Sequence, residues 1–271
     1  MSQEFYAVDL PGKSLYDKEF SVSIRKITPI EQKYILSLSQ KEQKSNRDYI
    51  NFIKKLTAID NPEVQFEDLF WFDVQYILYR IRFTTYAKHP IKLSLTCDNT
   101  IQDEDGNTVM CGNLIKHELN ADELKIYTPE DITNFERTIN LENLGEVKIR
   151  NKIIHDDVTI EEFMRKHKID QKDFQYRLLL VDLCSISEGK TLEEMYNLAE
   201  EGTITAEDIF AIEEWIQKHV WGVEEKLSYV CSKCGKEETR DYSLSLEDFF
   251  SAVWYKWFTR KRMVANEGIT S

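Results

Sequence analysis

Glycine and proline are scarce in this sequence, with 9 and 5 among 271 residues. Their scarcity argues against long disordered linkers and against an all-β fold with many tight turns. No run approaches the roughly 18 consecutive apolar residues that a membrane-spanning helix needs. Residues 1–16 also lack the basic segment and apolar run of a secretory signal. We therefore expect a chain without a membrane span that stays in the cytoplasm where it is made.

Basic residues are also few relative to acidic ones. The chain has 35 Lys and Arg against 48 Asp and Glu, which gives a formal net charge of −13. Such a chain repels nucleic acid as a whole, because binding to the phosphate backbone depends on Lys and Arg. A local exception is the basic cluster of Lys256, Arg260, Lys261 and Arg262. We interpret this cluster as the solvated end of a helix, where cations are favoured, and keep a nucleic-acid patch as the alternative.

The motifs of common enzyme classes are absent as well. The sequence has no glycine-rich phosphate loop, no GxSxG and no HExxH. The acidic run at residues 98–106 lacks the spacing of a calcium loop, because Ile101 falls where the first ligand is needed. We interpret this run as a polar hairpin tip. We interpret His155-Asp156-Asp157 as a loop before a helix rather than an acid–base cluster, and predict that the protein is not an enzyme.

Five cysteines are present, and an odd number in a cytoplasmic chain does not indicate a disulfide framework. Cys231-Ser-Lys-Cys234-Gly235 has the form of a zinc knuckle, in which two intervening residues let both thiolates reach one ion. Cys97 and Cys111-Gly112 flank a loop with an Asp-Gly turn, so a hairpin there brings this second pair to one end. The sequence therefore predicts a closed, structural zinc site formed by Cys97, Cys111, Cys231 and Cys234.

Other interpretations of the cysteines stay open. His117 is an alternative ligand in place of one cysteine, and four reduced thiols without a metal are another possibility. A redox role fits less well, because Cys231 follows a predicted strand and the CxxC motif does not open a helix. Cys184 lies in an apolar run and is predicted to be a small buried core residue.

The apolar pattern predicts an α+β fold that is mainly helical, with a small antiparallel, zinc-ribbon-like β element made from two distant hairpins. Thr28 with Glu31 and Thr205 with Asp208 are predicted helix caps, and residues 147–154 fit a strand. We expect four regions. They are an N-terminal strand and helical region (1–90), a split zinc ribbon (91–124 with 225–245), an inserted, mainly helical region (125–224), and a C-terminal aromatic helix with a tail (246–271).

Several short motifs follow one another in a definite order. They are Ile24-Arg-Lys-Ile27, Thr28-Pro-Ile-Glu-Gln-Lys33, the helix from Phe72 to Arg82, Cys97, Cys111, the CxxCG motif and Leu246-Glu-Asp-Phe-Phe250. This order resembles that of the T4-like bacteriophage baseplate hub and hub-assembly protein family, whose members also carry an aromatic helix directly before a cysteine-bearing hairpin. The resemblance covers most of residues 20–118 and 225–258.

The resemblance implies a non-enzymatic phage tail protein, either a subunit of the baseplate hub or a factor that assembles it. Its partners would be other baseplate and tail proteins, and its location the host cytoplasm during assembly and possibly the virion. The aromatic C-terminal helix, with Trp254 and Trp257, is a candidate contact surface. The alternative function is that of a zinc-ribbon regulatory factor that binds nucleic acid.

Overall fold

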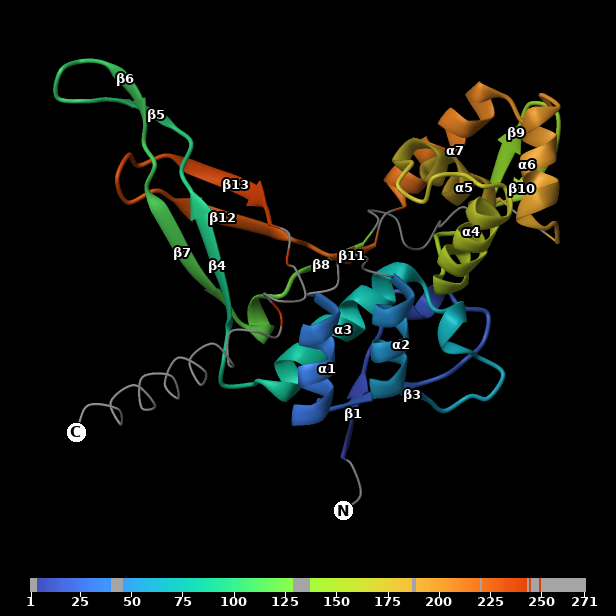
Figure 1. Cartoon of the computed structure of the whole chain (residues 1–271), viewed down its shortest axis with the longest axis horizontal. Coiled ribbons are helices and arrows are strands. Elements are labelled where there is room, and N and C mark those ends of the chain that lie inside the picture. The colour runs from blue at the N-terminus through green and yellow to red at the C-terminus, as the bar shows by residue number, and fades with distance from the viewer. Residues whose placement is uncertain are drawn as a thin grey trace, which may run out of the picture.

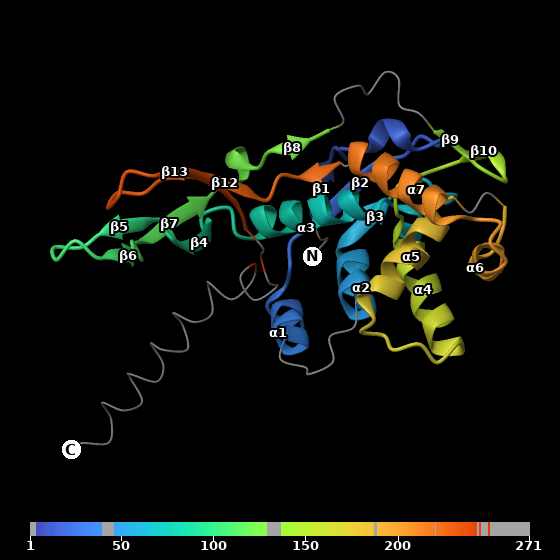
Figure 2. The ribbon, with the colours of Figure 1, turned by 90° about the horizontal axis from the view of Figure 1, so that it is seen from above.

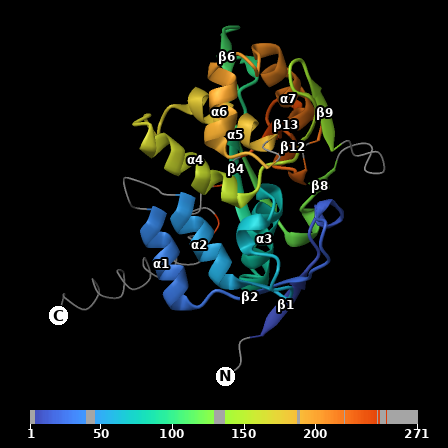
Figure 3. The same cartoon turned by 90° about the vertical axis from the view of Figure 1, so that its right-hand side faces the viewer.

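The computed structural model describes residues 4–39, 46–128, 137–186, 189–219, 221–242, 244 and 249. We divide these residues into an N-terminal part (5–85), a hairpin arm (91–119 and 226–241) and a helical part (138–218). The hairpin arm and the helical part extend from opposite sides of the N-terminal part (Figures 1 and 2). Seen from the helical side, α4–α7 lie above α1–α3 (Figure 3).

The N-terminal part combines one small sheet with three helices. The helix α1 begins at the predicted cap, because Thr28 N–H donates to Glu31 Oε2 at 2.9 Å and Glu31 N–H donates to Thr28 Oγ1 at 3.3 Å. The strands pair antiparallel in the order β1-β2-β3. The elements are β1 (Phe5–Val8), β2 (Val22–Arg25), α1 (Pro29–Ser39), α2 (Asn46–Leu56), β3 (Thr57–Ile59) and α3 (Trp71–Thr85).

The hairpin arm consists of paired strands from two distant segments. The strands β4 (Ile91–Thr96) and β7 (Leu114–Leu119) form one hairpin, which β5 (Thr100–Gln102) and β6 (Thr108–Met110) extend to a tip. The strands β12 (Lys226–Val230) and β13 (Glu237–Asp241) form the other. At the base of the arm, β8 (Ile126–Tyr127) pairs with β11 (Gly222–Val223), which joins chain segments about a hundred residues apart.

The helical part has its own hydrophobic cluster, which includes Leu141, Ile160, Leu183 and Trp215. A second, larger cluster unites the N-terminal part with the base of the hairpin arm through Ile91, Leu119 and Tyr229 among others. Burial of this apolar surface is the main force that holds the arm against α3. The elements of the helical part are β9 (Thr138–Leu141), β10 (Gly145–Lys148), α4 (Ile154–Lys166), α5 (Phe174–Ser185), α6 (Leu192–Glu200) and α7 (Ala206–Lys218).

The expected fold class is wrong in two respects. The fold is α+β, but the described residues are 41% helical and 24% strand, so it is not mainly helical. The strands form six small antiparallel sheets, four of them outside the β4–β7 and β12–β13 hairpins, and those two hairpins form no common sheet. A zinc ribbon therefore does not describe the β structure. Short strands that pair over long sequence distances leave little periodicity for a sequence to show.

The strand predicted for residues 147–154 is also wrong beyond Lys148. The helix α4 begins at Ile154, because the Asp156 carboxylate accepts the backbone N–H of Ile153 at 2.9 Å and binds Arg150 through both oxygens. The backbone of this segment pairs instead with the start of α3, where Trp71 N–H donates to Lys152 O at 3.0 Å. The capping carboxylate thus outweighs the β-type pattern.

The aromatic C-terminal helix and the basic cluster of residues 256–262 lie outside the described residues. Phe249 is described, and it is buried with its ring 4.7 Å from that of Tyr79. Ending the chain at Asp248 would therefore remove this core contact together with the predicted C-terminal contact surface. No described helix is both long enough and apolar enough to span a membrane.

Arg82 is an exception to the apolar interior of α3. Its side chain is fully buried, and its three guanidinium nitrogens have no hydrogen-bond partner within the part of the chain that the structure describes. Burial lowers its pKa to about 10, and the ring of Tyr86, whose centroid lies 4.6 Å away, partly compensates its charge. Arg82 forms no ion pair with a carboxylate among the described residues. A buried cation without a hydrogen bond opposes folding.

Replacing Arg82 with methionine is therefore expected to stabilise the protein by about 1–3 kcal/mol, because the aliphatic side chain needs no solvation. Denaturant unfolding of Arg82→Met measures the effect. Arg80→Met, two positions earlier on the same helix and only partly buried, is the matched control and should change stability by less than about 0.5 kcal/mol. A destabilised Arg82→Met would show that the charge is compensated.

Candidate metal centre

Two hairpins carry the four cysteines to one place. The ladder between β4 and β7 continues past Thr96, where Cys97 N–H donates to Asn113 O at 2.9 Å and Gly112 N–H donates to Cys97 O at 3.0 Å. Cys111 thus lies beside Cys97 where the β4–β7 ladder ends, before β5 and β6 continue to the tip. The register of β12 and β13 leaves residues 231–236 as the connecting turn.

The turn after β12 has the predicted knuckle geometry. Gly235 N–H donates to Cys231 O at 2.8 Å, and Cys231 N–H donates to Lys236 O at 2.8 Å. Gly235 has a φ of +72° and Gly112, which follows Cys111, has a φ of +62°. Side chains rarely adopt such angles, so glycine is favoured directly after a cysteine in both segments.

The four sulfur atoms form a compact cluster. All lie within 4.8 Å of one another. The Sγ atoms of Cys97 and Cys234 are 3.7 Å apart, and so are those of Cys111 and Cys231. Cys97, Cys111 and Cys231 are buried, and Cys234 is partly exposed. The structure therefore brings together the two predicted pairs across more than a hundred residues.

The spacing of the sulfurs distinguishes a metal site from disulfides. A disulfide needs about 2.05 Å between sulfurs, and all four thiols are free. Four thiolates about 2.3 Å from a tetrahedral zinc ion lie about 3.8 Å apart. The two distances of 3.7 Å agree with this value. The donor set and its geometry fit a four-cysteine site, which is closed to further ligands.

Two asparagines that the sequence analysis missed contact the sulfurs. Asn99 Nδ2 donates to Cys234 Sγ and Asn113 Nδ2 donates to Cys231 Sγ, each at 3.5 Å. Each asparagine follows a cysteine of the first pair by two positions and reaches a cysteine of the second pair. The repeated Cys-x-Asn pattern, Cys97-Asp-Asn99 and Cys111-Gly-Asn113, is the signal in the sequence that could have identified them. Such contacts orient ligands and stabilise their charge.

The electrostatics divide the four thiols into two kinds. Backbone N–H groups of Cys234 and Lys233, together with Asn113, lower the pKa of Cys231 to about 6. The backbone N–H of Lys236 and the amide of Asn99 lower the pKa of Cys234. For Cys97, the N–H of Asn99 favours the thiolate, but burial and the neighbouring thiols raise the pKa to about 12.

Burial and the neighbouring thiols of Cys231 and Cys234 likewise raise the pKa of Cys111. All four groups can therefore ionise together only if a cation offsets their mutual repulsion. A divalent metal ion at the centre would supply that charge.

The remaining candidates from the sequence lie elsewhere. His117 is on β7 beside Glu123, 3.6 Å away, and is not part of the cysteine cluster. Asp103 accepts N–H groups of Asp105 and Asn107 and forms a polar hairpin tip, as predicted. Cys184 is buried in the core of the helical part, also as predicted.

Asp156 and Asp157 are buried in ion pairs. Asp156 binds Arg150, and Asp157 binds Lys152 at 2.8 Å and Arg177 at 2.7 Å. These pairs hold the first turn of α4 to its surroundings. They give the two carboxylates a structural role, while His155 itself is exposed.

Comparison with known proteins and protein families gives a match to a family. No curated protein and no solved structure matches the chain. Residues 6–251 match the model of a protein family described as T4 bacteriophage base plate protein. The match includes the N-terminal part, the hairpin arm with all four cysteines, and the helical part, and it agrees with the resemblance noted in the sequence. This chain therefore belongs to the T4 bacteriophage base plate protein family.

Proposed function

We propose that this protein is a non-enzymatic structural part of the phage tail baseplate, either a subunit of the central hub or a factor that assembles it. Membership of the base plate family supports the baseplate role. We further propose that Cys97, Cys111, Cys231 and Cys234 bind a structural zinc ion. The observation that carries this proposal is the cluster of four thiols within 4.8 Å of one another, in which two pairs of sulfur atoms are 3.7 Å apart.

Zinc would give the hairpin arm a defined shape. The β4–β7 and β12–β13 hairpins form no common sheet, so the ion would cross-link them where backbone hydrogen bonds are few. The arm projects from the body (Figure 1) and exposes Met110, Leu114 and Val230. Exposed apolar side chains on a rigid projection suit protein–protein contact. Its partners would be other baseplate and tail proteins.

We also propose the organisation into residues 1–90, 91–124 with 225–245, 125–224 and 246–271. The separate hydrophobic cluster of the helical part supports the third region. The contact surface predicted on the C-terminal aromatic helix lies outside the described residues and stays a prediction.

Co-expression with other baseplate proteins of the same phage, followed by size-exclusion chromatography, tests the function. We expect at least one stable complex and no catalytic turnover. Mass spectrometry of purified virions then separates the two roles, because a hub subunit stays in the particle and an assembly factor leaves after acting in the host cytoplasm. A chain that stays monomeric with every baseplate protein, or binds DNA or RNA in a salt-sensitive manner, contradicts the proposal.

A further inference from the structure

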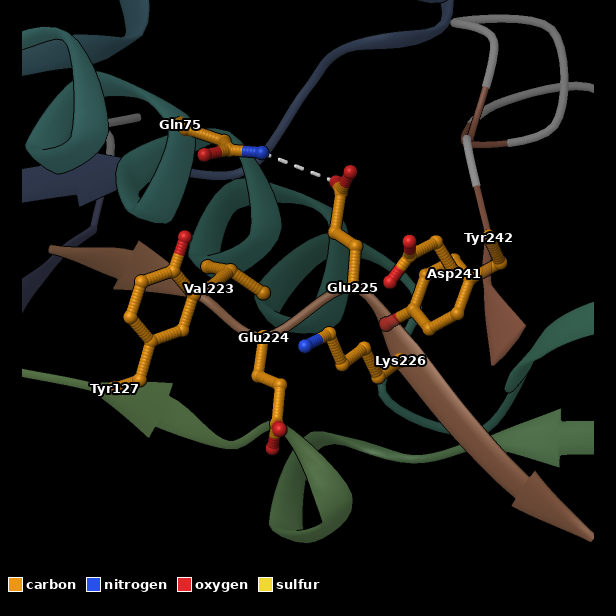
Figure 4. A pocket seen from close by; sticks show the side chains of 8 residues that line it. All are labelled: Gln75, Tyr127, Val223, Glu224, Glu225, Lys226, Asp241 and Tyr242. Atoms are coloured by element: carbon orange, nitrogen blue, oxygen red, sulfur yellow. Dashed lines mark hydrogen bonds between the residues drawn. The ribbon is translucent and has the colours of Figure 1, made fainter. Parts of the chain in front are cut away.

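A pocket of about 510 Å³ lies where the hairpin arm joins the N-terminal part. Its walls come from α3, β8, β11, β12, β13 and the link between β11 and β12 (Figure 4). The residues on which its chemistry depends are Tyr127, Glu224, Glu225, Lys226, Asp241 and Tyr242. The pocket is separate from the cysteine cluster, and the proposed zinc role does not use it.

One carboxylate of the pocket is held firmly. Glu225 Oε1 accepts a hydrogen bond from the hydroxyl of Tyr79 at 2.8 Å and another from Gln75 Nε2 at 3.0 Å. Tyr79 is fully buried in α3. Since both donors belong to one helix, the position of Glu225 is determined by the rigid body of the protein rather than by a mobile loop.

Two other carboxylates of the pocket have no such partners. Among the described residues, the side chains of Glu224 and Asp241 form no hydrogen bond and no ion pair, and neither does that of Lys226. Three acids and one base give the lining a formal charge of −2. Burial is the main cause that raises the pKa of Tyr127 and of Tyr242. The charges of Glu225 and Glu224 raise both further, and a hydrogen bond with Tyr79 lowers the pKa of Tyr242. The three carboxylates thus give the pocket a negative potential.

The arrangement favours an extended cation over a metal ion. A metal ion needs several ligand atoms that converge on one point. Among the described residues, only the four cysteines bring three or more such atoms together. The carboxylates of the pocket are instead spread around its walls, beside the ring of Tyr127, which is 42% exposed. Spaced carboxylates and an aromatic ring are what a guanidinium or ammonium group on a flexible side chain requires.

We propose that this pocket receives a cationic side chain, arginine or lysine, from another baseplate protein. This inference rests on the proposed function for the source of the cation. Because the walls come from both the arm and α3, the occupant would contact both and fix the arm at one angle to the body. The acidic charge of the whole chain, −13, would also favour the approach of a basic partner.

The pocket is tested with a defined probe that needs no other phage protein. The peptide Ac-Gly-Arg-Gly-Arg-Gly-NH₂ is titrated into the full chain, and NMR shifts of Val223 methyls and Tyr127 are followed. The same peptide with citrulline in place of arginine keeps the shape and removes the charge. We expect the arginine peptide to shift both residues in a saturable manner and the citrulline peptide to leave them unchanged.

The double variant Glu224→Gln/Asp241→Asn is expected to weaken peptide binding by about tenfold, since two exposed charge contacts together contribute about 1.4 kcal/mol. Glu104→Gln/Asp105→Asn is the matched control. It removes the same two charges at the exposed hairpin tip and should bind like the unmodified chain. Equal binding of the citrulline peptide, equal weakening by both double variants, or no binding of the arginine peptide overturns the proposal.

A second readout separates this inference from the proposed function. The chain and each double variant are co-expressed with the other baseplate proteins and compared by sizing. Loss of the complex with Glu224→Gln/Asp241→Asn alone supports the pocket as a partner site. A complex that forms equally with all three chains overturns the pocket but leaves the baseplate role standing. Peptide binding in the absence of any complex contradicts the baseplate partner as the source of the cation.

Discussion

Replacing Cys231 with serine is expected to abolish zinc binding and to lower the melting temperature by more than about 10 °C. Structural zinc contributes on the order of 10 kcal/mol in zinc-finger peptides, and each lost kcal/mol shifts the melting temperature of a chain this size by about 2–4 °C. The loss should be concentrated in the hairpin arm, because Cys231 joins the β12–β13 turn to Cys111 on the other hairpin. Calorimetry and zinc content of the same samples measure both effects.

The fifth cysteine provides the matched control. Cys184 is buried on α5 and lies outside the cluster. Cys184→Ala removes a thiol but should keep one zinc per chain, with a destabilisation of about 1 kcal/mol, as is usual for a small change in a core. A strong chelator should reproduce the Cys231→Ser behaviour in the unmodified chain. Insensitivity of the melting temperature to both the chelator and Cys231→Ser would exclude a structural metal.

Lowering the pH from 7 to 4 is expected to stabilise the unmodified protein relative to an Asp73→Asn variant. Asp73 is fully buried at the start of α3, where it accepts Gly12 N–H at 2.9 Å and the hydroxyl of Tyr16 at 2.7 Å. Burial raises its pKa to about 6, against the two hydrogen bonds that favour the carboxylate. The folded state therefore binds a proton that the unfolded chain, with a pKa near 4, has already released.

Because the pKa of Asp73 is higher in the folded state than in the unfolded state, protonation of Asp73 stabilises the folded state. The stabilisation that protonated Asp73 contributes is fully present below about pH 4 and is lost as the pH rises through 6. A change from the ordinary value of 3.8 to about 6 corresponds to about 3 kcal/mol. Urea unfolding of both proteins between pH 4 and pH 7 gives the difference. A gap between them that does not change with pH would show that Asp73 is ionised throughout.

Asp208 is expected to give the opposite dependence of stability on pH. It is also buried, and burial alone would raise its pKa, but N–H groups of Thr205 and Glu142 donate to it and lower the pKa. Its contribution is therefore present above the unfolded pKa and lost as the pH falls. An Asp208→Asn variant should approach the stability of the unmodified protein at low pH, while Asp73→Asn diverges from it.

Local signals in the sequence predicted several parts of the structure correctly. The Thr28–Glu31 and Thr205–Asp208 pairs mark helix starts because a reciprocal cap involves only residues three apart. The cysteine cluster was predictable for a similar reason. The CxxCG knuckle is local, and the second pair of cysteines, Cys97 and Cys111, flanks a hairpin that brings its two thiols together.

The parts that were missed depend on contacts between distant segments. The strands β8 and β11 have two residues each and pair across about a hundred positions, so neither shows an alternating pattern. The helix start at Ile154 is an exception, because Asp156 caps it locally within a segment whose apolar pattern favours a strand. The buried charge of Arg82 lies within an apolar helix pattern that predicts its neighbours well. Tertiary contacts decided the pairing of β8 with β11 and the burial of Arg82, and the apolar periodicity of a sequence does not show such contacts.

X-ray absorption spectroscopy at the zinc edge of the purified, untagged chain tests the central claim most directly. The account predicts one zinc per chain with four sulfur neighbours at about 2.3 Å and no nitrogen or oxygen in the first shell. A chain purified without zinc, or a spectrum with mixed ligands, would contradict the four-cysteine site and the cross-linked hairpin arm that depends on it.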